Sequence, residues 1–364
     1  MEFAARAGVE EITAEEQLQN VLAELGGEAD AKVNGILVDG LSVSSAFEGD
    51  DVEVILDATP FYAEGGGQLA DGGKITLSSG AIVEIDDVQT PVNGLSVHRG
   101  RIITGEVTLG SKAQAEIDLE RRNAISRAHT ATHMVHKAFR EILGETATQA
   151  GSENSPGRFR FDFPSTGAVA QGVLNDVEGR VNALLLDNLA VTAEVMTQDA
   201  AKKIGAMALF GEKYGDQVRV VSVGDWAREL CGGTHVSSSG QLGVVKLIGE
   251  SSIGAGVRRV EALVGADAYS FLAREHILLN SLTDLIKGAR VEELPSRVSD
   301  LVEKLKSVEK ELATFKTAQI LASATSLLKS TTKISGFEVL SAELEANISG
   351  DDLRTISLDL RNRL

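Results

Sequence analysis

The sequence has a single cysteine among its 364 residues, Cys231, and this scarcity limits both its chemistry and its compartment. One cysteine cannot form a disulfide within the chain, and such a chain fits a reducing cytosol. Long apolar runs are also missing: none approaches the roughly 20 residues of a membrane-spanning helix, and the N-terminus lacks the basic and then apolar pattern of a signal peptide. We therefore expect a soluble cytoplasmic protein that contacts no membrane.

Positive charge is scarce as well. The chain holds 35 Lys and Arg against 53 Asp and Glu, a net charge of −18, which argues against a general nucleic-acid binder. Residues 1–120 hold 6 of the basic and 23 of the acidic residues, so the rest of the chain is nearly neutral. Basic patches could form in that second part, and any contact with RNA must be local. The length and an apolar content of 43% predict about two or three domains with a sizeable core.

Histidine is a third scarce residue, with six in the chain. His129 and His133 lie within residues 121–143, a stretch without Gly or Pro whose apolar residues recur at helical spacing. On a helix the i, i+4 spacing points both imidazoles the same way, although two solvated histidines would give the same pattern. Cys231 and His235 are separated by Gly-Gly-Thr, a loop that can fold both side chains round one point. Three nitrogens and one sulfur suit tetrahedral zinc, so the sequence predicts one Zn2+ per chain at these four residues.

The same two motifs carry a resemblance. His129-Thr-Ala-Thr-His133 followed by Cys231-Gly-Gly-Thr-His235 resembles the editing domain of bacterial alanyl-tRNA synthetases and of the free-standing trans-editing proteins related to them. The similarity has no departure at the ligand positions and runs through most of the chain in order. It implies an aminoacyl-tRNA deacylase that removes serine or glycine from mischarged tRNA(Ala) and contacts the acceptor end of that tRNA. We find no ATP-site pattern, and therefore expect no ligase activity from this chain.

The expected fold is α+β with several domains. Residues 1–30 resemble the helical end of a tRNA-recognition region, and residues 31–120 alternate short β-branched runs with Gly and Asp, which predicts a small β-barrel. Residues 121–265 should form the α+β zinc-binding editing domain. Heptads in residues 266–330 predict an antiparallel helical hairpin, or else a coiled coil between chains. Residues 331–364 look like the truncated start of a C-terminal globular domain; the hairpin or that domain could mediate self-association.

A glycine-rich stretch interrupts the predicted barrel at Thr59-Pro-Phe-Tyr-Ala-Glu-Gly-Gly-Gly-Gln-Leu-Ala-Asp71. Successive glycines let the backbone approach another backbone or a ligand closely, and on the residues alone a barrel corner or wide turn is the better explanation. The resemblance instead places this stretch near the acceptor end of tRNA. It makes Gly66, Gly67 and Gln68 candidate tRNA-binding residues.

Two arginines and an aromatic run stand further along the chain. Arg258 and Arg259 follow Ser251-Ser-Ile-Gly-Ala-Gly-Val, which is consistent either with a hairpin carrying an exposed arginine pair or with a phosphate-facing turn. The resemblance favours contact with tRNA. Residues 158–163 alternate Arg or Asp with Phe, and aromatic residues at strand spacing predict a core rather than a base-stacking platform.

Editing must distinguish serine from alanine, which is smaller by one hydroxyl. A pocket that sieves only by size would admit alanine, so the site must require the hydroxyl. The resemblance implies that Thr132, Gln149 and Ser152 line this catalytic cleft, although Thr132 could simply bond to its own helix backbone. The role of zinc stays open, because four protein ligands make a closed, structural type of site whereas a hydrolytic zinc keeps one position free. A free-standing trans-editing hydrolase and a non-catalytic zinc or assembly module remain the alternative functions.

Overall fold

The computed structural model describes most of the chain, namely residues 27–92, 94–208, 215–286, 290–343 and 348–363. The helical part predicted for residues 1–30 lies almost wholly outside the described residues. The chain divides into two compact units, Met1–Ala273 and Arg274–Leu364.

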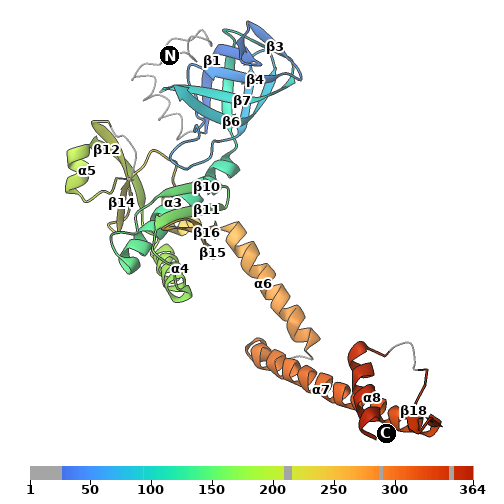
Figure 1. Ribbon diagram of the computed structural model, residues 1–364. Coiled ribbons are helices and arrows are strands. Elements are labelled where there is room, and N and C mark those ends of the chain that lie inside the picture. Colours follow the sequence, from blue (N-terminus) through green and yellow to red (C-terminus); the bar gives the residue numbers. More distant parts are fainter. Residues whose placement is uncertain (1–26, 93, 209–214, 287–289, 344–347, 364) are drawn as a thin grey trace. The chain divides into compact units, whose positions relative to one another are not determined.

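A closed antiparallel barrel opens the first unit, in blue to cyan in Figure 1. In ring order its six strands are β1 (Glu28–Val38), β4 (Asp51–Leu56), β7 (Leu95–Thr104), β6 (Ile82–Val92), β5 (Gly73–Leu77) and β9 (Lys112–Ile117), with β9 pairing back to β1. Outside the ring, β2 (Leu41–Ser42) pairs with β1, and β3 (Ser45–Phe47) pairs with β8 (Glu106–Thr108). Alternate residues such as Val54, Ile75 and Val83 are fully buried in its core. The predicted barrel is confirmed.

Two strands of the barrel differ from the sequence-based expectation. The closing strand β9 was not predicted, because its inward residues include Ala113 and Ala115, and alanine is depleted in strands. Within residues 31–120, all predicted to belong to the barrel, β8 instead pairs with β3 outside the ring.

The α+β part of the first unit is built round helix α3 (Leu119–Leu143). Asp118 caps its N-terminus, where its carboxylate accepts from the backbone N–H of Arg121 at 3.0 Å. Helix α3 packs with helix α4 (Gln171–Leu186) on one four-stranded antiparallel sheet. The strand order in this sheet is β10 (Gly151–Ser155), β11 (Arg158–Pro164), β16 (Val257–Val264) and β15 (Val245–Gly254).

The aromatic run on β11 belongs to the core, as predicted. Phe159, Phe161 and Phe163 are at most 1% exposed, and the ring of Phe163 lies 4.8 Å from that of Phe139 on α3. Burying each such side chain contributes about 1.5–3 kcal/mol. This aromatic cluster therefore fixes α3, and with it the two histidines of the candidate metal centre, against the sheet.

A three-stranded antiparallel sheet carries the cysteine loop. Its strands are β12 (Val191–Thr197), β13 (Gln217–Val223) and β14 (Ala227–Leu230), with the short helix α5 (Gln198–Lys203) after β12 and the 3-10 turn η1 (Ser239–Leu242) after the loop. Because β14 ends at Leu230, Cys231 is the first residue to leave the sheet. The loop that follows returns toward α3, which brings the two parts of the predicted ligand set together.

Long helices dominate the remaining chain. Helix α6 (Ala266–Leu285) crosses the boundary between the units and is followed by η2 (Val291–Glu293), α7 (Leu294–Leu327), η3 (Leu328–Ser330), the hairpin β17 (Thr332–Ile334) and β18 (Phe337–Val339), and α8 (Gly350–Arg363). Ile356 and Leu360 of α8 are buried against α7 and the segment after it. The two helices predicted for a hairpin are present, while their antiparallel packing and the predicted domain boundaries stay predictions. No helix among the described residues is long and apolar enough to cross a membrane.

Candidate metal centre

Four side chains from two distant segments converge on one point. His129 and His133 come from α3, and Cys231 and His235 come from the loop after β14, so that their ligand atoms all lie within 4.8 Å of one another. The Sγ atom of Cys231 lies 3.4 Å from Nε2 of His129 and 3.3 Å from Nε2 of His235. A tetrahedral ion with zinc-like bond lengths needs sulfur–nitrogen separations of about 3.5 Å. The four donors are therefore spaced to hold a metal.

Each histidine of this set has its second ring nitrogen engaged by an oxygen. The partners are Gln68 Oε1, 2.7 Å from Nδ1 of His129; the carboxylate of Glu229, in contact with Nδ1 of His133; and Thr130 Oγ1, 3.1 Å from Nδ1 of His235. Such partners fix the ring orientation of metal ligands in proteins. The buried Nε2 of His133 has no hydrogen-bond partner among the described residues, and a metal at the centre would satisfy it.

The carboxylate of Glu229 dominates the electrostatics beside the centre. It is 2% exposed and lies between His133 and His136, with its Oε1 2.8 Å from Nδ1 of His136. Burial acts to raise the pKa of Glu229, but the two histidines outweigh it and lower that pKa below its ordinary value. Burial likewise acts to lower the pKa of His133, but Glu229 and Cys231 outweigh it and raise that pKa. A buried carboxylate thus offsets positive charge at the ligands.

The thiol of Cys231 is set up as a thiolate. Burial acts to raise its pKa, but the histidines His129, His235 and His133 together hold it well below the usual range. Burial also lowers the pKa of His235 to about 3, which keeps this imidazole neutral. A thiolate and a neutral imidazole are the forms that bind a metal.

Of the two glycines in the cysteine loop, only Gly233 is required by the packing. At Gly233 an added Cβ would overlap the ring of His129, so only glycine lets the loop lie on this imidazole, whereas an added Cβ at Gly232 would meet open space. The loop is held from β13 by Arg219, whose Nη1 donates to the carbonyls of Cys231 at 2.9 Å and Gly233 at 2.7 Å. The backbone N–H of Gly233 donates to the Cys231 sulfur at 3.4 Å.

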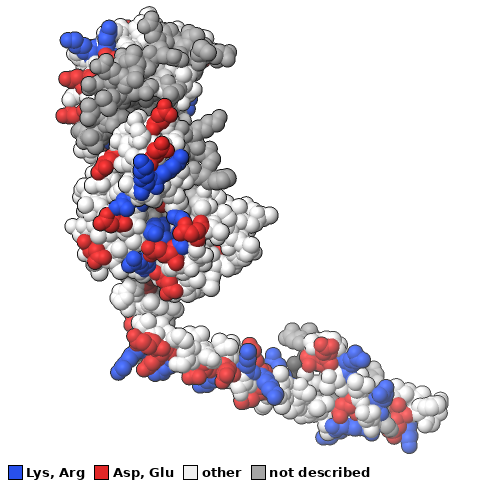
Figure 2. Space-filling view, turned by 90° about the vertical axis from the view of Figure 1, so that its left-hand side faces the viewer, with Lys and Arg blue, Asp and Glu red and all other residues white. Residues whose placement is uncertain are grey.

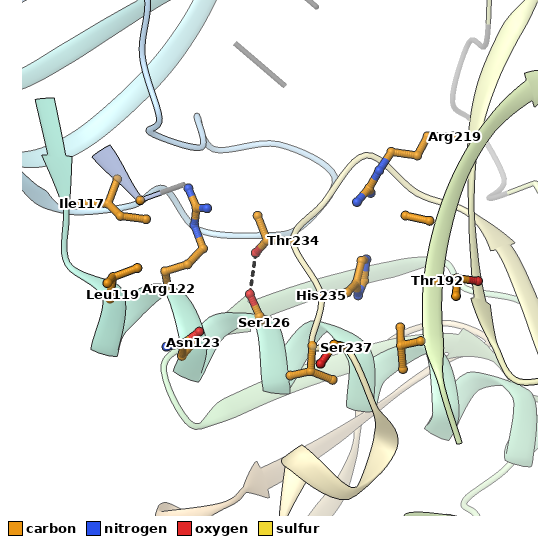
Figure 3. Close-up of a pocket in the computed structure, with 14 residues that line it drawn as sticks. Ile117, Leu119, Arg122, Asn123, Ser126, Thr192, Arg219, Thr234, His235 and Ser237 are labelled. Carbon is orange, nitrogen blue, oxygen red and sulfur yellow. Dashed lines mark hydrogen bonds between the residues drawn. The ribbon is translucent and has the colours of Figure 1, made fainter. Parts of the chain in front are cut away.

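A cleft of about 410 Å3 adjoins the centre on the side of His235. Its lining comes from α3, β12, β13 and the end of the cysteine loop, as Figure 3 shows for Asn123, Ser126, Thr192, Arg219, Thr234 and Ser237. His235 is the least buried of the four ligands and lines this cleft. No carboxylate among the described residues forms an ion pair with Arg219, so the cleft has a positive wall.

The structure brings together several site residues predicted from the sequence. Gln149 donates from Nε2 to Ser152 Oγ at 3.0 Å, and Gly67 packs directly on Ser152, where an added Cβ would overlap its backbone and hydroxyl. Thr132 is 1% exposed, bonds to the carbonyl of Ala128 at 3.0 Å and lies 2.6 Å from an amide oxygen on β10. The sequence left two roles open for Thr132, contact with the substrate or a bond to its own helix, and the bond to Ala128 is the second of these. None of these residues lines the cleft beside His235.

The glycine-rich stretch runs from the barrel to the metal centre. Gly66 is exposed, and both Gly66 and Gly67 adopt left-handed backbone conformations with φ of 55° and 77°. Gln68, by contrast, is fully buried and contacts His129 and Thr234. Its predicted role in tRNA binding stays untested, and its observed contacts are with the metal centre.

The two arginines predicted to contact tRNA are engaged by carboxylates. Arg258 donates to Glu250 through both Nε and Nη2, and Arg259 donates to Asp162 through two bonds of 2.7 Å. Neither arginine lines the cleft beside the metal centre. Figure 2 shows basic and acidic side chains interspersed over the described surface of one face. Any contact of these arginines with phosphate would have to compete with their carboxylate partners.

Two buried polar residues were not predicted from the sequence: Glu229, which contacts the centre, and Asn154, which contacts Thr132. Glu229 stands two residues before Cys231 on β14. It reaches His133 because β14 packs beside α3. Asn154 on β10 is fully buried, and its Oδ1 is the amide oxygen that accepts from Thr132. Neither position shows a local pattern that distinguishes it from an ordinary strand residue.

The chain was compared with known proteins. Residues 4–121 match the family of class II (A) tRNA synthetases, and residues 218–261 match the second additional domain of threonyl and alanyl tRNA synthetases. The alanine–tRNA ligase of a Nocardioides species is 63% identical over 92% of this chain and 37% of its own length. Those of Streptomyces avermitilis and Acidothermus cellulolyticus are 55% and 56% identical over 93% and 92% of this chain, and each is covered over 38% of its length. The chain therefore spans well under half the length of these relatives. It belongs to the alanyl-tRNA synthetase family.

Proposed function

We propose that the chain carries the editing activity of an alanyl-tRNA synthetase, the hydrolysis of serine or glycine from mischarged tRNA(Ala). The observation that carries this proposal is the convergence of His129, His133, Cys231 and His235 beside an open cleft. A chain whose relatives are tRNA ligases and whose ligand set opens on a cleft is suited to act on a charged tRNA end. The reducing cytoplasm, in which Cys231 stays reduced, is the compartment that fits this function.

We propose Zn2+ as the resident ion, because three imidazole nitrogens and one thiolate sulfur are its usual donors. When bound, zinc would supply a Lewis acid or a rigid support for the cleft. Among the four ligands, His235 faces the cleft and is the one whose contact with a substrate or water would matter most. Glu229 and Thr130 orient the imidazoles, and Cys231 offsets part of the ion's charge.

We propose that the acceptor end of the tRNA enters the cleft along Arg219, whose charge suits a phosphodiester. Thr132, Gln149 and Ser152 lie outside this cleft, on the side of Gly66 and Gly67, and we propose that they recognise the amino acid there. Support comes from two half-buried polar groups: Ser152 lies against Gly67, and Gln149 donates to its hydroxyl. Such groups would hydrogen-bond to the hydroxyl of serine. Alanine would be rejected because it would leave these buried polar groups without a partner.

The test is a deacylation assay with Ser-tRNA(Ala), Gly-tRNA(Ala) and Ala-tRNA(Ala), with metal content measured on the same sample. We expect hydrolysis of the first two, little of the third, and no ATP-dependent alanylation. Cys231→Ala should lose both metal and activity, whereas His276→Ala, a change at an exposed histidine of α6, should keep both. Full metal content without any hydrolysis would favour a non-catalytic zinc module, which a closed set of four protein ligands also supports.

A further inference from the structure

The connection between β4 and β5 leaves the barrel and is fastened to α3. The carboxylate of Asp71 is fully buried. Both of its oxygens accept from Nε of Arg122, the fourth residue of α3, at 2.9 Å. Arg122 also donates to the carbonyl of Pro60 at 2.8 Å, and the N–H of Tyr62 donates to Asp71 at 2.7 Å. One buried ion pair therefore holds both ends of this loop on the helix that carries two metal ligands.

The middle of the same loop is fastened to the sheet. The N–H of Asn154 donates to the carbonyl of Gly67 at 2.7 Å, and the N–H of Leu69 donates to the carbonyl of Asn154 at 3.1 Å, so that Gln68 pairs in parallel with β10. Gly67 needs its positive φ and its missing side chain to lie this close to Ser152. The backbone of Gln68 is thus placed without any help from its side chain.

The side chain of Gln68 reaches both halves of the metal centre. Its Oε1 accepts from the backbone N–H of Thr234 at 2.9 Å and lies 2.7 Å from Nδ1 of His129, while its Nε2 donates to Thr234 Oγ1 at 2.9 Å. A backbone N–H can only donate, which fixes the oxygen of the amide on this side. Nδ1 of His129 must then be the donor to the same oxygen, and Nε2 keeps its lone pair for a metal.

We infer that Gln68 is a positioning residue for the metal centre, and that the barrel, through this one side chain, sets the affinity of the centre for its ion. Gln68 selects the metal-binding tautomer of His129 and ties this ligand to the loop that carries Cys231 and His235. Metal binding and the docking of the barrel loop therefore stabilise each other. The inference rests on the proposed metal binding but not on the proposed hydrolysis.

The first experiment measures affinity for Zn2+ by chelator competition and the absorption spectrum of the Co2+-loaded chain. Gln68→Leu removes the acceptor for His129 and should lower zinc affinity about 10- to 100-fold, the usual effect of losing such an outer partner. It should also shift the ligand-field bands of Co2+. Gln68→Glu keeps an acceptor for both donors and should stay close to the wild type.

Two matched variants separate this role from a merely structural one. Tyr62→Phe removes the bond from the tyrosine hydroxyl to the carbonyl of Gly65, in the same loop but away from the ligands. Gln89→Leu removes another glutamine of the first unit, which bonds to Glu64 and Asp87. Both should bind zinc like the wild type. The inference is wrong if Gln68→Leu binds zinc as tightly as the wild type, or if Tyr62→Phe weakens binding to the same extent.

A second measurement uses the unmodified chain and needs no variant to fold. Hydrogen exchange followed by mass spectrometry, with and without added Zn2+, should show slower exchange in peptides covering residues 59–71 as well as in those with the ligands. Protection of the ligand segments alone would overturn the coupling. If the wild type binds no zinc at all, the proposed metal site fails first, and the two failures are thereby distinguished.

Discussion

A buried histidine in the barrel offers a quantitative test of how the loop is anchored at its start. His98 on β7 is fully buried; its Nδ1 donates to the carbonyl of Val54 at 3.0 Å and its Nε2 lies 2.7 Å from Oγ1 of Thr59. The N–H of Phe61 donates to the same hydroxyl at 3.1 Å. A neutral imidazole satisfies this chain of hydrogen bonds, and it secures the residues that lead into the glycine-rich stretch.

The pKa of His98 gives the sign and size of the expected effect. Burial lowers this pKa from 6.5 to about 4, against a smaller opposing effect of the bond to Val54. Between these values the unfolded chain binds a proton that the folded chain does not, so stability is complete above pH 6.5 and falls as the pH drops toward 4. At 1.36 kcal/mol per pKa unit, the whole loss is about 3 kcal/mol, of which about 2 kcal/mol is reached by pH 5.

The assay compares the wild type with His98→Gln, which cannot titrate. Opening free energies of the barrel amides in β4 and β7, measured by native-state hydrogen exchange between pH 7.5 and pH 5, should diverge by about 2 kcal/mol. Taking the difference between the two proteins cancels the titration of all other groups. His276→Gln should follow the wild type. Parallel curves for His98→Gln and the wild type would refute the assignment of a neutral, buried His98.

Three further substitutions test contacts in and around the metal centre. Gly233→Ala should abolish zinc binding without unfolding the sheets, because its Cβ would displace the ring of His129; retention of zinc in elemental analysis would contradict the close packing. Asp71→Asn should lower the free energy of unfolding by about 3–5 kcal/mol, since it breaks the buried pair with Arg122. Urea titration measures this loss, and a loss well below about 3 kcal/mol would contradict the role of the pair. Thr132→Val should cost about 1–3 kcal/mol in the same titration while zinc content stays at the wild-type level.

The sequence indicated which four side chains converge, but not their surroundings, for a physical reason. His129 and His133 are neighbours through helix geometry, and Cys231 and His235 through a short glycine loop, so each pair is a local pattern. Glu229 and the amide role of Gln68 come from contacts between distant segments, which no local spacing reveals. The glycines beside Gln68 indicated that the backbone approaches another group closely. In the structure that group is Ser152 of the same chain. The barrel was predicted from its β-branched strands, whereas the alanine-rich closing strand β9 carried no such signal.

The metal centre also joins parts of the chain that are made at very different times. Cys231 and His129 are 102 residues apart, and His129 and Gln68 a further 61, so the converging side chains and Gln68 come from three separate stretches of the chain. During translation the barrel and α3 emerge first and must wait for the cysteine loop. Because loop closure over such distances is slow and entropically costly, the centre should be among the last features to form. Until the cysteine loop arrives the set of four donors is incomplete, so the proposed metal binding requires all three stretches to have folded.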